Sequence, residues 1–131
     1  MKLSHIVFMG TPEFSIPTLS AVMETLPNTK ISVFCKEDRV RGRGKTPSPC
    51  AIKKWATAQH LDIYTPPTKE RLEKQVHELK PDLIIIIAYG MILPKSITDT
   101  YLCINSHASL LPQYRGPSPI HASLLNGDQK T

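Results

Sequence analysis

The most restrictive feature of this sequence is an unbroken apolar run, Leu-Ile-Ile-Ile-Ile-Ala, at residues 83–88. Most of its residues are β-branched, which favours extended backbone, and neither face of the extended run is polar. A strand that is apolar on both faces has to be covered on both sides, as interior strands of parallel sheets are. We therefore expect residues 83–88 to form an interior strand of such a sheet.

The rest of the chain alternates short apolar runs with segments of helical periodicity. Strands are expected at residues 5–9, 30–35, 61–64 and 102–106, and helices at residues 16–26, 49–58, 69–79, 95–98 and 118–125. Ser48 and Pro49 are expected to supply the cap and the first-turn proline of the second helix. This alternation predicts an α/β fold, a doubly wound, Rossmann-like parallel sheet with helices on both faces.

Length and composition are those of an ordinary globular domain. The chain has 131 residues, of which 40% are hydrophobic and 21% charged, so a single domain over residues 1–131 is expected. No run is long enough to span a membrane and the start has no signal-peptide pattern. The three cysteines have no metal-ligand spacing, so we expect no metal site and reduced thiols in the cytoplasm. We also expect a monomer.

The turn after the first strand excludes one class of ligand. A dinucleotide-binding turn needs three glycines at set spacing and a later acidic residue, whereas this turn contains only Gly10. Nicotinamide or flavin binding is therefore not supported.

The net charge of +5 comes from one segment. Residues 36–54 hold seven basic and two acidic side chains, while the remainder holds nine of each. Within it, a basic loop is expected at residues 36–47, where glycines on both sides of Arg43 let the backbone present the guanidinium to a phosphate. A solvated loop would have the same composition, so both interpretations stay open. The basic side chains expected to face a polyanion are Arg39, Arg41, Arg43 and Lys45.

Asn105 and His107 form a candidate catalytic pair at the carboxyl end of the strand expected at residues 102–106. Two residues apart on a strand, they would share one side of the pleat. Asn105 can donate to an oxyanion, and an imidazole, which titrates at about 6.5, can move a proton near neutral pH. The alternative is that Asn105 caps a turn and His107 is a hydrogen-bonded core residue.

In a doubly wound sheet the carboxyl ends of the strands bind ligands where the strand order reverses. Gly10, Cys35, Tyr89–Gly90 and the candidate pair would all reach this edge. Aliphatic side chains near it would suit a flat heteroaromatic ligand, although they can equally be core. These side chains are Ile86, Ile87, Ala88, Met91, Leu110 and Leu111.

With these motifs in place, the chain resembles the folate-dependent formyltransferases from Ile6 to Thr131. The resemblance rests on four stretches taken in order: Gly10 to Phe14, Asp38 to Pro49 with its Gly-Arg-Gly-Lys, Ala88 to Pro94, and Asn105 to Gly116.

The resemblance implies transfer of the formyl group of 10-formyltetrahydrofolate to the amino group of methionine on initiator tRNA. Asn105 and His107 match the family's catalytic Asn and His, and the basic loop matches the insertion that holds the acceptor stem. The residues implied to border the folate are Ile87, Tyr89, Gly90, Met91, Ser109, Leu110, Leu111 and Pro112.

One departure from the family pattern concerns the third catalytic residue, an Asp beyond the helix that ends at Leu125. It has no counterpart within the 131 residues, and Asp128, in the turn after that helix, lies at the wrong spacing to replace it. The chain therefore resembles the amino-terminal part of a formyltransferase catalytic domain, and we expect weak turnover or none from the 131 residues alone. Two alternatives stay open: an RNA-binding module without catalysis, and a formyltransferase for another amine such as a nucleotide sugar.

Overall fold

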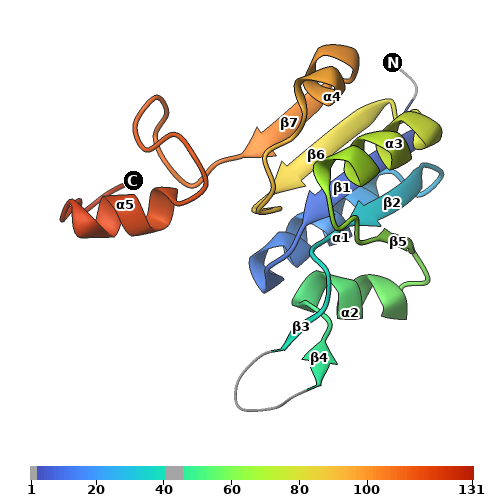
Figure 1. Ribbon diagram of the computed structural model, residues 1–131, viewed down its shortest axis with the longest axis horizontal. Coiled ribbons are helices and arrows are strands. Elements are labelled where there is room, and N and C mark those ends of the chain that lie inside the picture. Colours follow the sequence, from blue (N-terminus) through green and yellow to red (C-terminus); the bar gives the residue numbers. More distant parts are fainter. Residues whose placement is uncertain (1–2, 41–45) are drawn as a thin grey trace.

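The structure, a computed structural model, describes residues 3–40 and 46–131. Its centre is a five-stranded sheet in the order β5-β2-β1-β6-β7, in which every pair is parallel (Figure 1). The strands are β1 (His5–Gly10), β2 (Lys30–Phe34), β5 (Asp62–Tyr64), β6 (Leu83–Ile87) and β7 (Cys103–Ser106). The predicted parallel α/β fold is confirmed, and β6 lies inside the sheet as expected.

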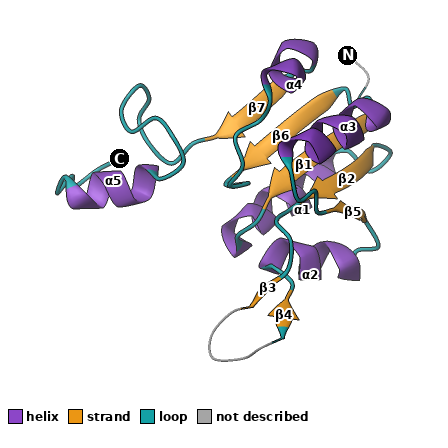
Figure 2. Cartoon of the chain, viewed as in Figure 1, coloured by secondary structure: helices purple, strands orange, loops and turns teal. Residues whose placement is uncertain are grey.

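Helices connect the strands and cover both faces of the sheet, except for the last helix, which follows β7 and lies apart from the sheet (Figure 2). They are the 3-10 turn η1 (Glu13–Ser15), α1 (Ile16–Thr25), α2 (Ala51–Ala58), α3 (Lys69–Leu79), α4 (Lys95–Thr100) and α5 (Pro119–Leu125). Successive side chains of a strand point to opposite faces. On β1, Ile6 and Phe8 therefore pack with Leu19 of α1, in the cluster that also holds α2 residues.

Val7 of β1 points to the opposite face, where it packs with Leu72 of α3 and Ile97 of α4. The sheet is therefore wound on both sides: α1 and α2 cover one face and α3 and α4 the other.

The start of α2 differs from the prediction. The helix begins at Ala51 with Cys50 as its cap, two residues later than the Ser48 cap that was expected. Pro47 and Ser48 form strand β4 (Pro47–Ser48), which pairs antiparallel with β3 (Arg39–Val40) in a separate two-stranded hairpin. The Ser48 prediction was wrong because pairing with β3 holds Ser48 in extended backbone.

The carboxyl-terminal part of the chain stands away from the sheet beyond β7, with α5 and the preceding loop to the left in Figure 1. Several large apolar side chains there are exposed, from Ile120 at 47% to Leu125 at 91%. No helix in the described ranges is both long and apolar enough to cross a membrane.

Asp82 ties the amino edge of the sheet together. Its Oδ2 accepts hydrogen bonds from the backbone N–H of Ser4 at 2.7 Å, from the Ser4 hydroxyl at 2.7 Å and from the N–H of His5 at 2.9 Å. These donors stabilise the carboxylate and hold the pKa of Asp82 below its usual value. The bonds join the start of β1 to the residue before β6.

Burial predicts a large difference between two isoleucines of the sheet. Ile84 on β6 is 0% exposed and Ile104 on β7 is 54% exposed. Truncation of a buried isoleucine removes apolar contacts and leaves a cavity, so Ile84→Ala should lower the free energy of unfolding by about 2–5 kcal/mol. The same change at Ile104 should cost well under half as much. Urea unfolding followed by circular dichroism measures both, and equal losses would contradict the described burial.

The Asp82 carboxylate also predicts a pH dependence. Because its pKa is lowered in the folded state, its stabilisation is complete above the usual value of 3.8 and is lost as the pH falls below it. Asp82→Asn should therefore melt at a lower temperature than the wild type at pH 7, with the difference shrinking at the acid end. Asp99→Asn, which removes only an exposed pair with Lys95, is the matched control. A pH-independent difference would contradict this role of the carboxylate.

Candidate functional site

The strand order places the reversal point of the sheet between β1 and β6. From β1 the chain moves outward to β2 and β5, and then returns to β6 on the other side of β1. The segments that follow β1 and β6 meet there, since the hydroxyl of Thr11 donates to the carbonyl of Tyr89 at 3.0 Å. Gly10 allows η1 to pack against the strand end, because a β-carbon at Gly10 would lie 2.9 Å from Oγ of Ser15.

The side chains at the end of β6 and that of Tyr89, two residues after it, are largely buried in the core. Tyr89 is 2% exposed and Ile87 is 6% exposed, and they belong to the two clusters on opposite faces. Burial raises the pKa of the Tyr89 phenol above its usual value. Ile86 also packs against a core cluster. Of the aliphatic side chains that the sequence placed near a ligand, Ile86 and Ile87 are therefore part of the core. Gly90 is exposed and has a φ of +80°.

Asn105 lies near the end of β7 and is exposed. It pairs with Ile86 in the sheet and shares a face of β7 with Cys103, two residues earlier. The sheet thus presents the amide at its carboxyl edge, as the sequence predicted.

His107 follows the end of β7, so its direction is set by a hydrogen bond rather than by the pleat. Its Nε2 lies 2.9 Å from the carbonyl oxygen of Tyr114. A carbonyl can only accept, so Nε2 carries the hydrogen and donates it. In the neutral ring Nδ1 is then the nitrogen with a free lone pair. The sequence predicted that Asn105 and His107 would share one side of the pleat. Because β7 ends at Ser106, His107 lies beyond the strand and is oriented by this loop contact instead.

Asp128 acts on the loop and not on the imidazole. The hydroxyl of Tyr114 donates to Oδ2 of Asp128, and Nδ2 of Asn126 donates to Oδ1 at 2.7 Å. The bond to the carboxylate raises the pKa of Tyr114. Tyr114 therefore links the end of α5 to His107, a role that sequence reasoning missed. No sequence pattern reports it, because the group that binds His107 is a backbone carbonyl.

The segment at residues 109–112 forms a turn after His107. The hydroxyl of Ser109 donates to the carbonyl of Gln113 at 2.6 Å, and the Gln113 N–H donates to the carbonyl of Leu110 at 3.1 Å. Leu110 and Leu111 are 66% and 60% exposed, so their side chains are open to a ligand.

The basic hairpin is described only at its base. Arg39 on β3 is exposed, while Arg41, Arg43 and Lys45, also predicted to bind a polyanion, lie outside the described residues. Lys53 of α2 donates to Asp38 at 2.7 Å, which raises the pKa of Lys53. This pair fastens the segment before β3 to α2.

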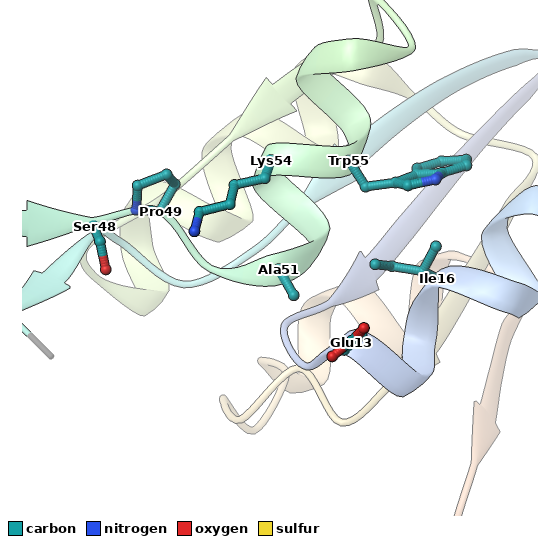
Figure 3. A pocket seen from close by; sticks show the side chains of 7 residues that line it. All are labelled: Glu13, Ile16, Ser48, Pro49, Ala51, Lys54 and Trp55. Atoms are coloured by element: carbon teal, nitrogen blue, oxygen red, sulfur yellow. The ribbon is translucent and has the colours of Figure 1, made fainter. Parts of the chain in front are cut away.

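A shallow depression of about 500 Å³ lies beside the hairpin (Figure 3). It is lined by Glu13, Ile16, Ser48, Pro49, Ala51, Lys54 and Trp55. Neither Asn105 nor His107 contributes to it, and sequence reasoning did not find it. Over residues 3–40 and 46–131, no three His, Cys, Asp or Glu side chains are grouped to hold a metal ion.

A doubly wound sheet with an amide and an imidazole at its carboxyl edge suits the chemistry of acyl-group transfer. Residues 3–131 match the Formyl transferase family, and the chain belongs to this family. It is 42% identical to the methionyl-tRNA formyltransferase of Ehrlichia ruminantium (strain Gardel), over 97% of this chain and 43% of the relative. It is 44% identical to that of Clostridium novyi (strain NT), over 96% and 42% respectively.

A solved structure supports the fold. The crystal structure of a 4-N formyltransferase from Francisella tularensis superposes with a TM-score of 0.60 at 19% identity, over 95% of this chain and 46% of that one. The predicted resemblance to formyltransferases is confirmed. The chain spans less than half the length of the relatives that it matches.

The contact between His107 and Tyr114 predicts the tautomer of the imidazole. With Nε2 donating to the Tyr114 carbonyl, the neutral ring should carry its hydrogen on Nε2 and none on Nδ1. Two-bond ¹H–¹⁵N correlation spectra of the labelled chain above pH 8 distinguish the two nitrogens. His121, which is exposed on α5, should show averaged tautomers and serves as the internal reference. A hydrogen on Nδ1 of His107 would rule out the described loop contact.

Proposed function

We propose that this chain is part of an enzyme that transfers the formyl group of 10-formyltetrahydrofolate to the amino group of methionine on initiator tRNA. The observation that supports it most is the 42–44% identity to methionyl-tRNA formyltransferases over almost the whole chain. The presence of Asn105 and His107 at the carboxyl edge is consistent with it. The proposed setting is the cytoplasm, where a monomer acts during translation initiation.

The residue chemistry fits the reaction. The methionyl amine would attack the formyl carbon, and the bond from that carbon to N10 of the folate would then break. The attacking amine loses a proton and the leaving N10 gains one. The exposed amide of Asn105 would donate to the oxygen that gains negative charge. His107 would hold or move a proton at Nδ1, because Nε2 is occupied by the Tyr114 carbonyl. Fixing one nitrogen leaves the other free to act on the reacting groups.

Some of the proposed folate contacts can use their side chains, and others only their backbone groups. Ser109, Leu110, Leu111 and Pro112 follow His107 directly, and the two exposed leucines would pack on a flat heteroaromatic ring. Ile87 and Tyr89 have buried side chains, so they would offer backbone groups only. Gly90 and the half-buried Met91 lie at the reversal point of the sheet. These residues fit an apolar ligand that is oriented by backbone hydrogen bonds.

The basic hairpin is the proposed tRNA contact. Arg39, together with Arg41, Arg43 and Lys45 beyond the described part, would bind phosphates of the acceptor stem. The exposed Lys54 of α2 borders the same side of the molecule, beside β4 (Figure 3).

The first test is formyl transfer from 10-formyltetrahydrofolate to methionyl-tRNA under single-turnover conditions, measured in the enzyme of which this chain is proposed to be a part. Loss of one donor to a developing oxyanion typically lowers the rate by about 10²–10³, which is the expectation for Asn105→Ala. Loss of a positioned proton-transfer group typically lowers it by about 10²–10⁴, which is the expectation for His107→Ala. His121→Ala on α5 and Asn28→Ala after α1 are matched controls that should leave the rate unchanged. Equal rates for His107→Ala and His121→Ala would refute the catalytic assignment, and preferred formylation of a free nucleotide-sugar amine would favour another substrate.

The second test separates the enzyme from an RNA-binding module. Arg39→Ala should weaken binding of initiator tRNA and lower the slope of log K against log salt by about 1, because one phosphate contact is lost. Arg71→Ala, an exposed arginine on α3, is the matched control. RNA binding of this kind without any turnover would favour the module, and an unchanged slope would refute the tRNA role of Arg39.

A further inference from the structure

The side chain of Lys36 crosses the reversal point of the sheet. Lys36 comes two residues after β2, and β2 is separated from β6 by β1. Nevertheless a β-carbon on Gly90, beyond the end of β6, would lie 3.1 Å from Cε of Lys36 and 3.9 Å from its Nζ. The lysine stem must therefore pass over the carboxyl end of β1 and bring its ammonium group to the edge where ligands of this fold class bind.

Gly90 makes this approach possible. Its φ of +80° is a conformation that side chains other than glycine rarely adopt, and the missing β-carbon leaves room for the lysine stem. The side chain of Lys36 therefore packs directly against the backbone of Gly90. From the sequence, Gly90 was expected to border the folate, and Lys36 was counted in the basic loop at residues 36–47 but not among the side chains expected to face a polyanion.

The charge of Lys36 is not balanced by its neighbours. It is half-buried, and no carboxylate in the described part of the chain lies within 4.0 Å of its ammonium group. Glu37 is exposed, and Asp38 is bonded to Lys53 at 2.7 Å. A cation held at a ligand-binding edge without a protein counter-ion is suited to an anionic ligand group.

We propose that Nζ of Lys36 binds a phosphate oxygen near the aminoacylated end of the tRNA and so guides that end from the basic hairpin to Asn105 and His107. The inference rests on the proposed function. Phosphate is favoured over a folate carboxylate because Lys36 leads directly into the basic hairpin, three residues before Arg39. Gly90 is itself a proposed folate contact, so the test also measures folate affinity.

The test compares three variants of the whole chain by fluorescence anisotropy with a labelled acceptor-stem hairpin ending in single-stranded ACCA. Lys36→Gln keeps much of the length of the side chain and removes its charge. It should weaken binding of the hairpin roughly ten-fold and lower the slope of log K against log salt by about 1. Lys36→Arg should retain most of the affinity. Lys30→Gln removes the same charge at the opposite end of β2, where the lysine only makes an exposed pair with Asp62, and should bind like the wild type.

A second hairpin without the four unpaired nucleotides locates the contact. Lys36→Gln should bind this blunt hairpin as the wild type does, whereas Arg39→Ala should weaken both. Equal effects of Lys36→Gln and Lys30→Gln would overturn the inference and leave the proposed function intact. A loss of tetrahydrofolate affinity in Lys36→Gln with unchanged RNA binding would also overturn it, in favour of a carboxylate. Failure of the wild type to bind any RNA would overturn the proposed function and the inference together.

Discussion

The fold depends on the parallel pairing of β1 with β2 on one side and β6 on the other. All three strands are largely buried on both faces, so they need helices on both sides, and parallel strands require crossover connections that supply those helices. The same pairing directs every carboxyl end to one edge. Thr11, Lys36, Gly90 and Asn105 come from four different segments and reach that edge for this single reason.

The polar side chains at the edge are held less firmly than the sheet itself. Asn105 is placed by its register against Ile86, but His107 depends on one hydrogen bond to a loop carbonyl. The loop is in turn held by the bond from the Tyr114 hydroxyl to Asp128. These contacts bury little apolar surface, since Leu110, Leu111 and Leu125 remain exposed. The imidazole is therefore oriented by polar contacts within residues 107–128 rather than by the core.

Sequence reasoning predicted the features that follow from local pattern. The β-branched run at residues 83–88 and the alternation of strands and helices were sufficient for the parallel sheet, and the strand end at Ser106 was placed correctly. The start of α2 was missed because Ser48 can cap a helix or pair as a strand, and pairing with Arg39 decides between them. The contacts of His107 with Tyr114 and of Lys36 with Gly90 join backbone groups to distant side chains, which no residue pattern records. The roles of Asn105, His107 and the residues around them stay predictions.

The central claim is that the carboxyl edge near Asn105 and His107 receives the formyl donor. Chemical-shift mapping of the ¹⁵N-labelled chain during titration with tetrahydrofolate tests it most directly. The account predicts saturable shifts of the Asn105 side-chain amide, the His107 ring and the Gly90 N–H. Shifts confined to Trp55 and Ser48, in the depression beside the hairpin, with Asn105 and His107 unchanged, would contradict it.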